Sequence, residues 1–156
     1  MQIHLLAVGN KMPAWVELAY ADYAKRLPSD YALHLKEIRP EPRNTGKTAA
    51  QIKALEAARI HMALPINSLT IVLDEHGQDI TSVALARLLK QWHQDNRTIA
   101  FVIGGADGLD STIKEKSALS IRLSSMTLPH GMVRVFFVEQ LYRAWSILNN
   151  HPYHRA

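Results

Sequence analysis

The sequence IAFVIGGADGLDS, residues 99–111, decides the fold because it passes within a few residues from an apolar run to glycines and then to polar residues. Ile99–Ile103 is typical of a buried strand, and it leads directly into the glycine-rich segment Gly104–Gly108. Asp110 or Ser111 can then cap a short helix. A strand, a glycine turn and a helix in succession indicate an α/β protein.

The same alternation continues on both sides of this segment. Upstream, Leu69–Leu73 is predicted to be a buried strand that runs into an acidic turn at Asp74–Gly77. Thr81 can cap the next helix, whose apolar face is Leu85, Leu88, Leu89 and Trp92. Downstream, Leu119–Leu123 is the last predicted strand. A long helix begins at Gly131 or later, with a core stripe at Val135, Val138, Leu141, Trp145 and Leu148.

The N-terminal half follows this pattern less regularly. Ile3–Gly9 is predicted to be a buried strand, and Pro13 suits the first turn of a helix that Pro28 closes. Ala32–Ile38 alternates as a half-exposed strand does, and Arg39–Thr48 is predicted to be a mobile surface loop. A helix follows, with one face at Ile52, Leu55, Ala58 and Met62. We therefore expect one domain over residues 1–156, with a mostly parallel sheet flanked by helices.

The composition excludes several kinds of protein. The chain has 156 residues and no cysteine, which rules out disulfides, thiolate-bound zinc, cysteine-ligated iron–sulfur clusters and cysteine nucleophiles. No apolar run approaches the roughly 18 residues that a membrane span needs, and no signal peptide is recognisable at the N-terminus. We therefore expect a cytoplasmic protein that does not bind membranes.

Positive charge is concentrated near the C-terminus. The whole chain has a net charge of +4, yet the segment from Ser111 to Ala156 holds six basic residues against two acidic ones. A solvated basic face and a phosphate-binding patch both fit this distribution.

Several short motifs carry weak signals for particular ligands. Gly104–Gly108 has the pattern GGxxG, which suits either a plain turn or a loop whose backbone approaches a ligand closely. The segment Asn44–Thr48 imitates the end of a P-loop, but Glu41 stands where the first glycine belongs. His151 and His154 are close enough in sequence to share a zinc ion but have no third ligand nearby, so no metal is expected.

Two segments near the C-terminus are more informative. The loop Leu123–His130 is made of small and apolar residues that can surround a flat heterocycle, although it also fits a simple connection from strand to helix. The terminal residues 150–155, NHPYHR, combine aromatic and cationic groups that suit a base and a phosphate. A tail that docks on its own or another subunit fits them equally well.

These residues together resemble the SPOUT methyltransferase family. The resemblance rests on LLAVGNKMPAWV, VLDEHG, IGGADGL, LSSMTLPHGMVRVFFVEQLYRAWSI and the terminal NHPYHR, and it runs nearly end to end. It is weakest over residues 39–64. Within the family the chain resembles the RlmH type, which methylates N3 of a pseudouridine in 23S ribosomal RNA on the assembled ribosome.

The resemblance implies a homodimeric enzyme that uses S-adenosyl-L-methionine and has a C-terminal trefoil knot over roughly residues 70–150. It assigns cofactor binding to the end of one strand, the glycine loop and the loop after the last strand, which are Leu73, Gly104, Gly105, Leu123, Ser124, Ser125, Met126, Thr127 and Leu128. Binding of the RNA substrate is expected at Arg134, Tyr153 and Arg155, whose positive charges and aromatic ring suit an anionic base or phosphate and stacking.

The chemistry of this reaction needs positioning and the removal of one proton. Methyl transfer from a sulfonium is an in-line displacement, and the accepting N3 carries a weakly acidic proton that must leave. The candidate catalytic residues, whose roles the sequence leaves open, are His130, Glu139, Arg143, His151 and Arg155. Two alternatives remain: a non-catalytic RNA-binding or ribosome-associated protein, and a nucleotide-dependent enzyme that uses Gly46–Thr48.

Overall fold

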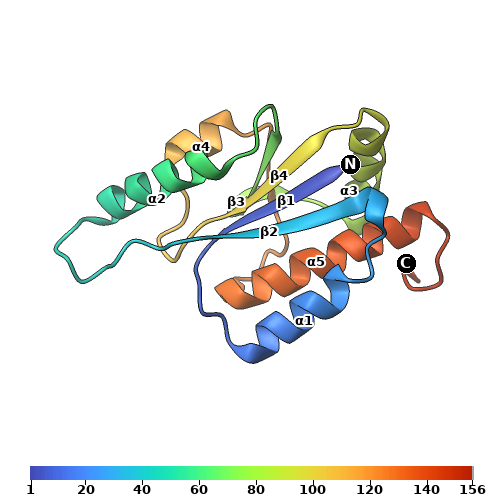
Figure 1. Cartoon of the computed structure of the whole chain (residues 1–156), viewed down its shortest axis with the longest axis horizontal. Helices are drawn as coiled ribbons and strands as arrows, with labels where there is room; N and C mark the ends of the chain where they lie inside the picture. The colour runs from blue at the N-terminus through green and yellow to red at the C-terminus, as the bar shows by residue number, and fades with distance from the viewer. Residues whose placement is uncertain (156) are drawn as a thin grey trace.

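The computed structural model describes residues 1–155 as a five-stranded parallel sheet with helices on both faces (Figure 1). The strand order is β2-β1-β4-β3-β5, and all four neighbouring pairs are parallel. The elements are β1 (Gln2–Val8), α1 (Ala14–Ala24), a short 3₁₀ helix (Ser29–Tyr31), β2 (Ala32–Ile38), α2 (Ala49–Ala63), β3 (Leu69–Asp79), α3 (Ser82–Gln94), β4 (Thr98–Ile103), α4 (Ser111–Lys116), β5 (Leu119–Arg122) and α5 (His130–Leu148). The predicted α/β class with a parallel sheet is confirmed.

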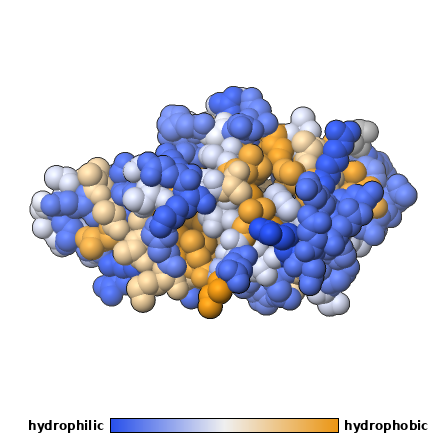
Figure 2. All heavy atoms as spheres, turned by 90° about the horizontal axis from the view of Figure 1, so that it is seen from above, coloured by the Kyte–Doolittle hydropathy of each residue, from blue (hydrophilic) through white to orange (hydrophobic). Residues whose placement is uncertain are grey.

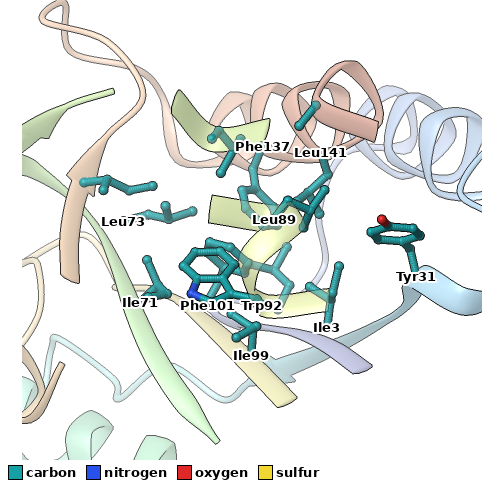
Figure 3. Close-up of a cluster of buried hydrophobic side chains, with 14 of the residues drawn as sticks. Ile3, Tyr31, Ile71, Leu73, Leu89, Trp92, Ile99, Phe101, Phe137 and Leu141 are labelled. Atoms are coloured by element: carbon teal, nitrogen blue, oxygen red, sulfur yellow. The ribbon is translucent and has the colours of Figure 1, made fainter. Parts of the chain in front are cut away.

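The sheet separates two hydrophobic cores. On one face, Phe101 of β4 packs between Trp92 of α3 and Phe137 of α5, with ring centroids 6.1 and 4.6 Å apart (Figure 3). On the other face, α2 and α4 cover Leu6, Val8, Val72 and Val102 through Ile60 and Ile113. Because strands buried on both faces need apolar residues at nearly every position, the continuous apolar runs in the sequence are explained.

Side-chain caps set the starts of three helices. Thr81 accepts a hydrogen bond from the Ala84 N–H at 3.1 Å, as the sequence predicts. Asp110 accepts from the Thr112 N–H at 2.9 Å, which decides between the two predicted caps of α4. Thr48 and Gln51 form a reciprocal capping box at the start of α2.

Three predictions about local structure are wrong. Asp74–Gly77 is not a turn, since β3 continues to Asp79 and resumes its pairing with β5 after a register shift between Leu73 and Gln78. Gly77 permits this, because a Cβ there would lie 2.5 Å from the Ile121 backbone. In α2, Leu55 and Met62 are exposed, and the buried residues are Ile52, Glu56, Ala57 and Ile60. In α5 the predicted stripe is wrong only in part: Val138 and Leu141 are buried and Trp145 and Leu148 pack against the core, but Val135 is only partly buried and the buried face also includes Arg134 and Phe137.

The loop over residues 39–48 makes several contacts. The guanidinium of Arg59 pairs with Glu41 and also donates to the Arg39 carbonyl at 2.9 Å. Arg43 pairs with Asp107 of the glycine loop at 2.8 Å. These contacts attach the loop to α2 and to the segment between β4 and α4.

None of the helices in residues 1–155 combines the length and the apolar character needed to cross a membrane.

Candidate functional site

A cleft opens where β4 and β5 end and where β3 leaves its pairing with β4 after Leu73, between the glycine loop and the loop that enters α5. Two adjoining cavities form it, with about 410 and 870 Å³ of empty space. Both are lined by Leu73, Asp74, Glu75, Thr127, Leu128 and Val133. Since carboxyl ends of parallel strands share one edge of the sheet, residues far apart in sequence meet here.

Most of the residues expected to bind the cofactor line this one cleft. Leu73, Thr127 and Leu128 line both cavities, Gly104 and Gly105 line the larger, and Leu123, Ser124 and Met126 line the smaller. Ser125 belongs to the same loop but is not part of the lining. Sequence reasoning missed the lining residues Asp74, Glu75, Ile103, Ala106, Gly108, Leu109, Arg122 and Val133. The sequence signal that could have identified Asp74 and Glu75 is their position directly after the apolar run Leu69–Leu73.

The glycine loop packs tightly against itself. A Cβ on Gly104 would lie 2.8 Å from Leu109 Cγ and 2.9 Å from the Gly108 carbonyl carbon. The Gly108 N–H donates to the Gly105 carbonyl at 3.0 Å, and Gly108 has a φ of +84°. Gly104 is therefore required by the packing of the loop itself, in addition to any close approach of a ligand.

Asp74 places a negative charge at the wall of the cleft. Burial alone would raise the pKa of Asp74, but hydrogen bonds from Lys114 and from the His76 N–H outweigh it and lower that pKa. The Lys114 ammonium lies 2.8 Å from the Asp74 carboxylate. Asp74 is therefore ionised and paired at neutral pH.

His130, the first residue of α5, lines the larger cavity. Its Nε2 atom is buried and has no hydrogen-bond partner within residues 1–155. Burial, and then the nearby positive charge of Arg134, lower the pKa of His130. The imidazole is therefore neutral at pH 7. Its buried Nε2 lies towards Gly9, where a Cβ would stand 3.0 Å away.

Arg134 lies one turn further along α5 and is only 2% exposed. Its Nη1 donates to Glu37 Oε2 at 2.9 Å and its Nη2 to the Gly9 carbonyl at 3.1 Å. These bonds tie α5 to the carboxyl ends of β1 and β2. In this arrangement Arg134 positions α5 and offers no surface to an RNA phosphate, unlike the substrate-binding role expected from the sequence.

A second polar cluster lies along the C-terminal half of α5. Arg143 donates to Glu139 Oε1 through Nε at 2.9 Å and Nη2 at 2.6 Å, and its Nη1 donates to the His154 carbonyl at 3.0 Å. The Tyr153 hydroxyl donates to Glu139 Oε1 at 2.8 Å and lies 3.2 Å from the Tyr23 hydroxyl. The chain tail is thereby folded back onto α5 and α1.

The candidate catalytic residues therefore fall into two groups. His130 is at the cleft, whereas Glu139 comes nine residues later, about 14 Å along α5 at the usual helical rise. His151 packs against Trp145 with ring centroids 5.6 Å apart, and its Nδ1 accepts from the Tyr153 N–H at 3.2 Å. Arg155 is exposed at the end of the described chain. Within this chain, the tail and the cleft are separate sites.

The other sequence motifs form no site of their own. Lys47, in the P-loop-like segment, binds Thr45 Oγ1 at 3.0 Å and Glu41 at 3.2 Å instead of facing a phosphate cradle. In the part of the chain that the structure describes, no group of three or more His, Asp or Glu side chains is placed to hold a metal ion.

The buried His130 predicts a dependence of stability on pH. Because its pKa is lowered in the folded state, the unfolded chain binds more protons as the pH falls below about 6.5, and folding stability decreases there. Replacing His130 with Gln removes this contribution. We expect urea denaturation at pH 5 and pH 7 to show a smaller pH effect in H130Q than in the unmodified chain, and equal pH effects would contradict it.

Comparison with known proteins agrees with this geometry. The family model described as predicted SPOUT methyltransferase matches residues 1–154. Ribosomal RNA large subunit methyltransferase H of Janthinobacterium sp. (strain Marseille) is 61% identical, and that of Herminiimonas arsenicoxydans is 60% identical, each over 100% of both chains. A crystal structure of a probable methyltransferase from Bordetella pertussis Tohama I shares the fold, with a TM-score of 0.57, 15% identity and coverage of 92% of this chain and 93% of that one. The chain belongs to the SPOUT methyltransferase family.

Proposed function

We propose that this chain transfers a methyl group from S-adenosyl-L-methionine to N3 of a pseudouridine in the 23S ribosomal RNA of the assembled ribosome. The observation that carries the proposal is full-length identity of about 60% with relatives named ribosomal RNA large subunit methyltransferase H. A fold neighbour alone would not carry it, since one fold supports many reactions.

The cleft has the features that this cofactor requires. Leu73, Leu128 and Val133 offer apolar contacts to an adenine ring, and the backbone of the glycine loop offers polar groups to the ribose and the amino-acid part. Glu75 places negative charge beside a cationic ligand, whereas the charge of Asp74 is balanced by Lys114. When bound, the cofactor supplies an electrophilic methyl group on a positively charged sulfur.

His130 is the residue best placed to move the N3 proton. Its imidazole is neutral and is the only candidate catalytic side chain among residues 1–155 that lines the cleft. A neutral imidazole accepts a proton, whereas an imidazolium does not. We assign His130 as the general base, and Glu139, Arg143, His151, Tyr153 and Arg155 to contacts with the RNA or across a dimer.

The homodimer is part of this proposal. The buried apolar residues of α5 are Phe137, Val138, Leu141, Tyr142 and Ala144, and its other apolar residues are partly buried or exposed. The α1–α5 side still exposes Trp15, Leu18 and Phe136, which are 53%, 72% and 39% exposed. On the opposite side, α2 and the segment after it expose Met62 and Ile66, but hydrophilic residues separate the apolar patches there (Figure 2). We therefore place the dimer contact on α1 and α5.

We expect sedimentation at micromolar concentration to report a dimer, and Leu18→Glu to shift it towards monomer. Dimer formation would bury the carboxylate at position 18 in the interface without an ion-pair or hydrogen-bond partner, which is unfavourable. Leu55→Glu, on the exposed side of α2, is the matched control and should leave the dimer intact. A monomer in the unmodified chain would remove the dimer from the proposal.

The trefoil knot expected over roughly residues 70–150 stays a prediction. It would consist of the glycine loop, the loop after β5 and α5, which together surround the cleft.

Calorimetric titration distinguishes the proposed function from its alternatives. Saturable binding of S-adenosylmethionine without binding of ATP supports the methyltransferase. Binding of ATP alone would favour the nucleotide-dependent enzyme, and binding of neither, with retained binding of ribosomes, would favour a non-catalytic protein.

A further inference from the structure

Glu56 is a charged residue in the interior of the protein. Its side chain lies on the buried face of α2 and is 5% exposed, next to an apolar core that contains Val8 and Ile60. Its Oε2 accepts a hydrogen bond from the Glu41 N–H at 3.0 Å. Within residues 1–155 the carboxylate takes part in no ion pair.

The carboxylate of Glu56 lies directly behind the glycine loop. A Cβ on Gly105 would stand 2.9 Å from Glu56 Oε1 and 3.1 Å from Val8 Cγ1, so these atoms occupy the space where a side chain would be. Gly105 itself lines the larger cavity. The backbone of Gly105 therefore separates the carboxylate from the cleft.

The charged groups around Glu56 are paired elsewhere. Arg59 is held by Glu41 and the Arg39 carbonyl, and Arg43 is held by Asp107. Asp74, the other shielded acid at the cleft, has Lys114 as its counterion. Burial of a carboxylate without a counterion is unfavourable. Among residues 1–155, Glu56 thus differs from Glu41, Asp107 and Asp74 in having no counterion.

We propose that the cationic cofactor is the counterion of Glu56, which acts through Gly105 as a positioning residue that favours a positively charged sulfur in the cleft. This inference rests on the proposed function. In methyl transfer the S–CH₃ bond breaks, its electron pair stays on sulfur, and the N–CH₃ bond forms as the N3 proton leaves. The cofactor therefore loses its positive charge, and Glu56 favours the methylated cofactor over the demethylated product.

The proposal is tested by measuring the affinity of the protein for S-adenosylmethionine, which carries the positive charge on sulfur, and for S-adenosylhomocysteine, which lacks it. Glu56→Gln keeps the size of the side chain and an acceptor for the Glu41 N–H but removes the charge. We expect calorimetry to show that E56Q weakens binding of S-adenosylmethionine by about tenfold and binding of S-adenosylhomocysteine by less than about threefold. Glu115→Gln, the same change on the exposed side of α4, is the control and should alter neither affinity.

Each other outcome has a defined meaning. If E56Q weakens binding of both ligands equally, Glu56 has only a structural role and the proposal is wrong. If neither affinity changes, Glu56 does not contribute to cofactor binding. If E56Q does not fold, as judged by its melting curve, the pair Glu56→Asp and Glu56→Asn is compared instead. The aspartate must then retain a higher preference for S-adenosylmethionine than the asparagine, and equal preferences would overturn the proposal. Failure of the unmodified chain to bind S-adenosylmethionine would contradict the proposed function itself.

Discussion

Replacing Gly104 with valine should weaken binding of S-adenosylmethionine by about 100-fold or more, equivalent to about 2.8 kcal/mol. A Cβ at this position would lie 2.8 Å from Leu109 Cγ and 2.9 Å from the Gly108 backbone, so the loop has to move to accept it. Gly104, Gly105 and Gly108 all line the larger cavity, and a displaced loop changes its shape. Calorimetric titration of the variant measures the effect.

The variant must be folded for this result to have meaning. Overpacking of this kind costs about 1–3 kcal/mol of stability, which a domain of this size tolerates at low temperature. Ala54→Val, on the exposed face of α2, adds the same branched side chain away from the cleft and should bind normally. A folded G104V protein with unchanged affinity would refute the cofactor site.

Deleting residues 153–156 should abolish methylation of ribosomes while S-adenosylmethionine affinity stays within a few-fold of that of the full chain. Tyr153 contacts Glu139 and Tyr142 of α5 and Tyr23 of α1, none of which lines the cleft. An aromatic ring and a guanidinium suit contacts with a base and a phosphate. Methyl incorporation into ribosomes that lack the modification and cofactor titration are measured on the same truncated protein.

The tail also contributes packing, so a conservative variant is needed beside the deletion. Tyr153→Phe keeps the contacts of the ring with Tyr23 and Tyr142 but loses the hydrogen bond to Glu139. We expect it to fold normally and to keep the affinity for the cofactor. Full activity of the truncated chain would show that the tail has no part in methylation. Equal loss of methylation and cofactor binding would show that the tail contributes to the cofactor site and not to recognition of the RNA.

Much of the fold follows from local signals in the sequence. The apolar runs at residues 69–73 and 99–103 are strands, and Thr81 and Asp110 cap the helices that follow the strands. Such features depend on a few neighbouring residues, so periodicity and capping chemistry detect them. The extension of β3 to Asp79 depends instead on its pairing with β5, which local patterns do not contain.

Buried charges are the features that sequence patterns missed. Apolar periodicity assigns the core face of α2 to Leu55 and Met62, yet Glu56 is buried and Met62 is 89% exposed. In α5 the same reasoning left Arg134 outside the core stripe, although it is 2% exposed. Both residues are buried because backbone groups of distant segments, at Glu41 and Gly9, bind them. The residues expected to bind the cofactor were named from the family resemblance. That Asp74 and Glu75 also line the cleft is visible only once the strands are assembled into the sheet.

Transfer of a labelled methyl group to ribosomal RNA tests the central claim most directly. The full-length chain is incubated with methyl-labelled S-adenosylmethionine and with assembled ribosomes that lack the modification, and the labelled nucleotide is identified by mass spectrometry. We predict incorporation of one methyl group per large subunit, at N3 of a pseudouridine in 23S RNA. Absence of incorporation under conditions where the cofactor binds, or a label on a different atom or RNA, would contradict the account.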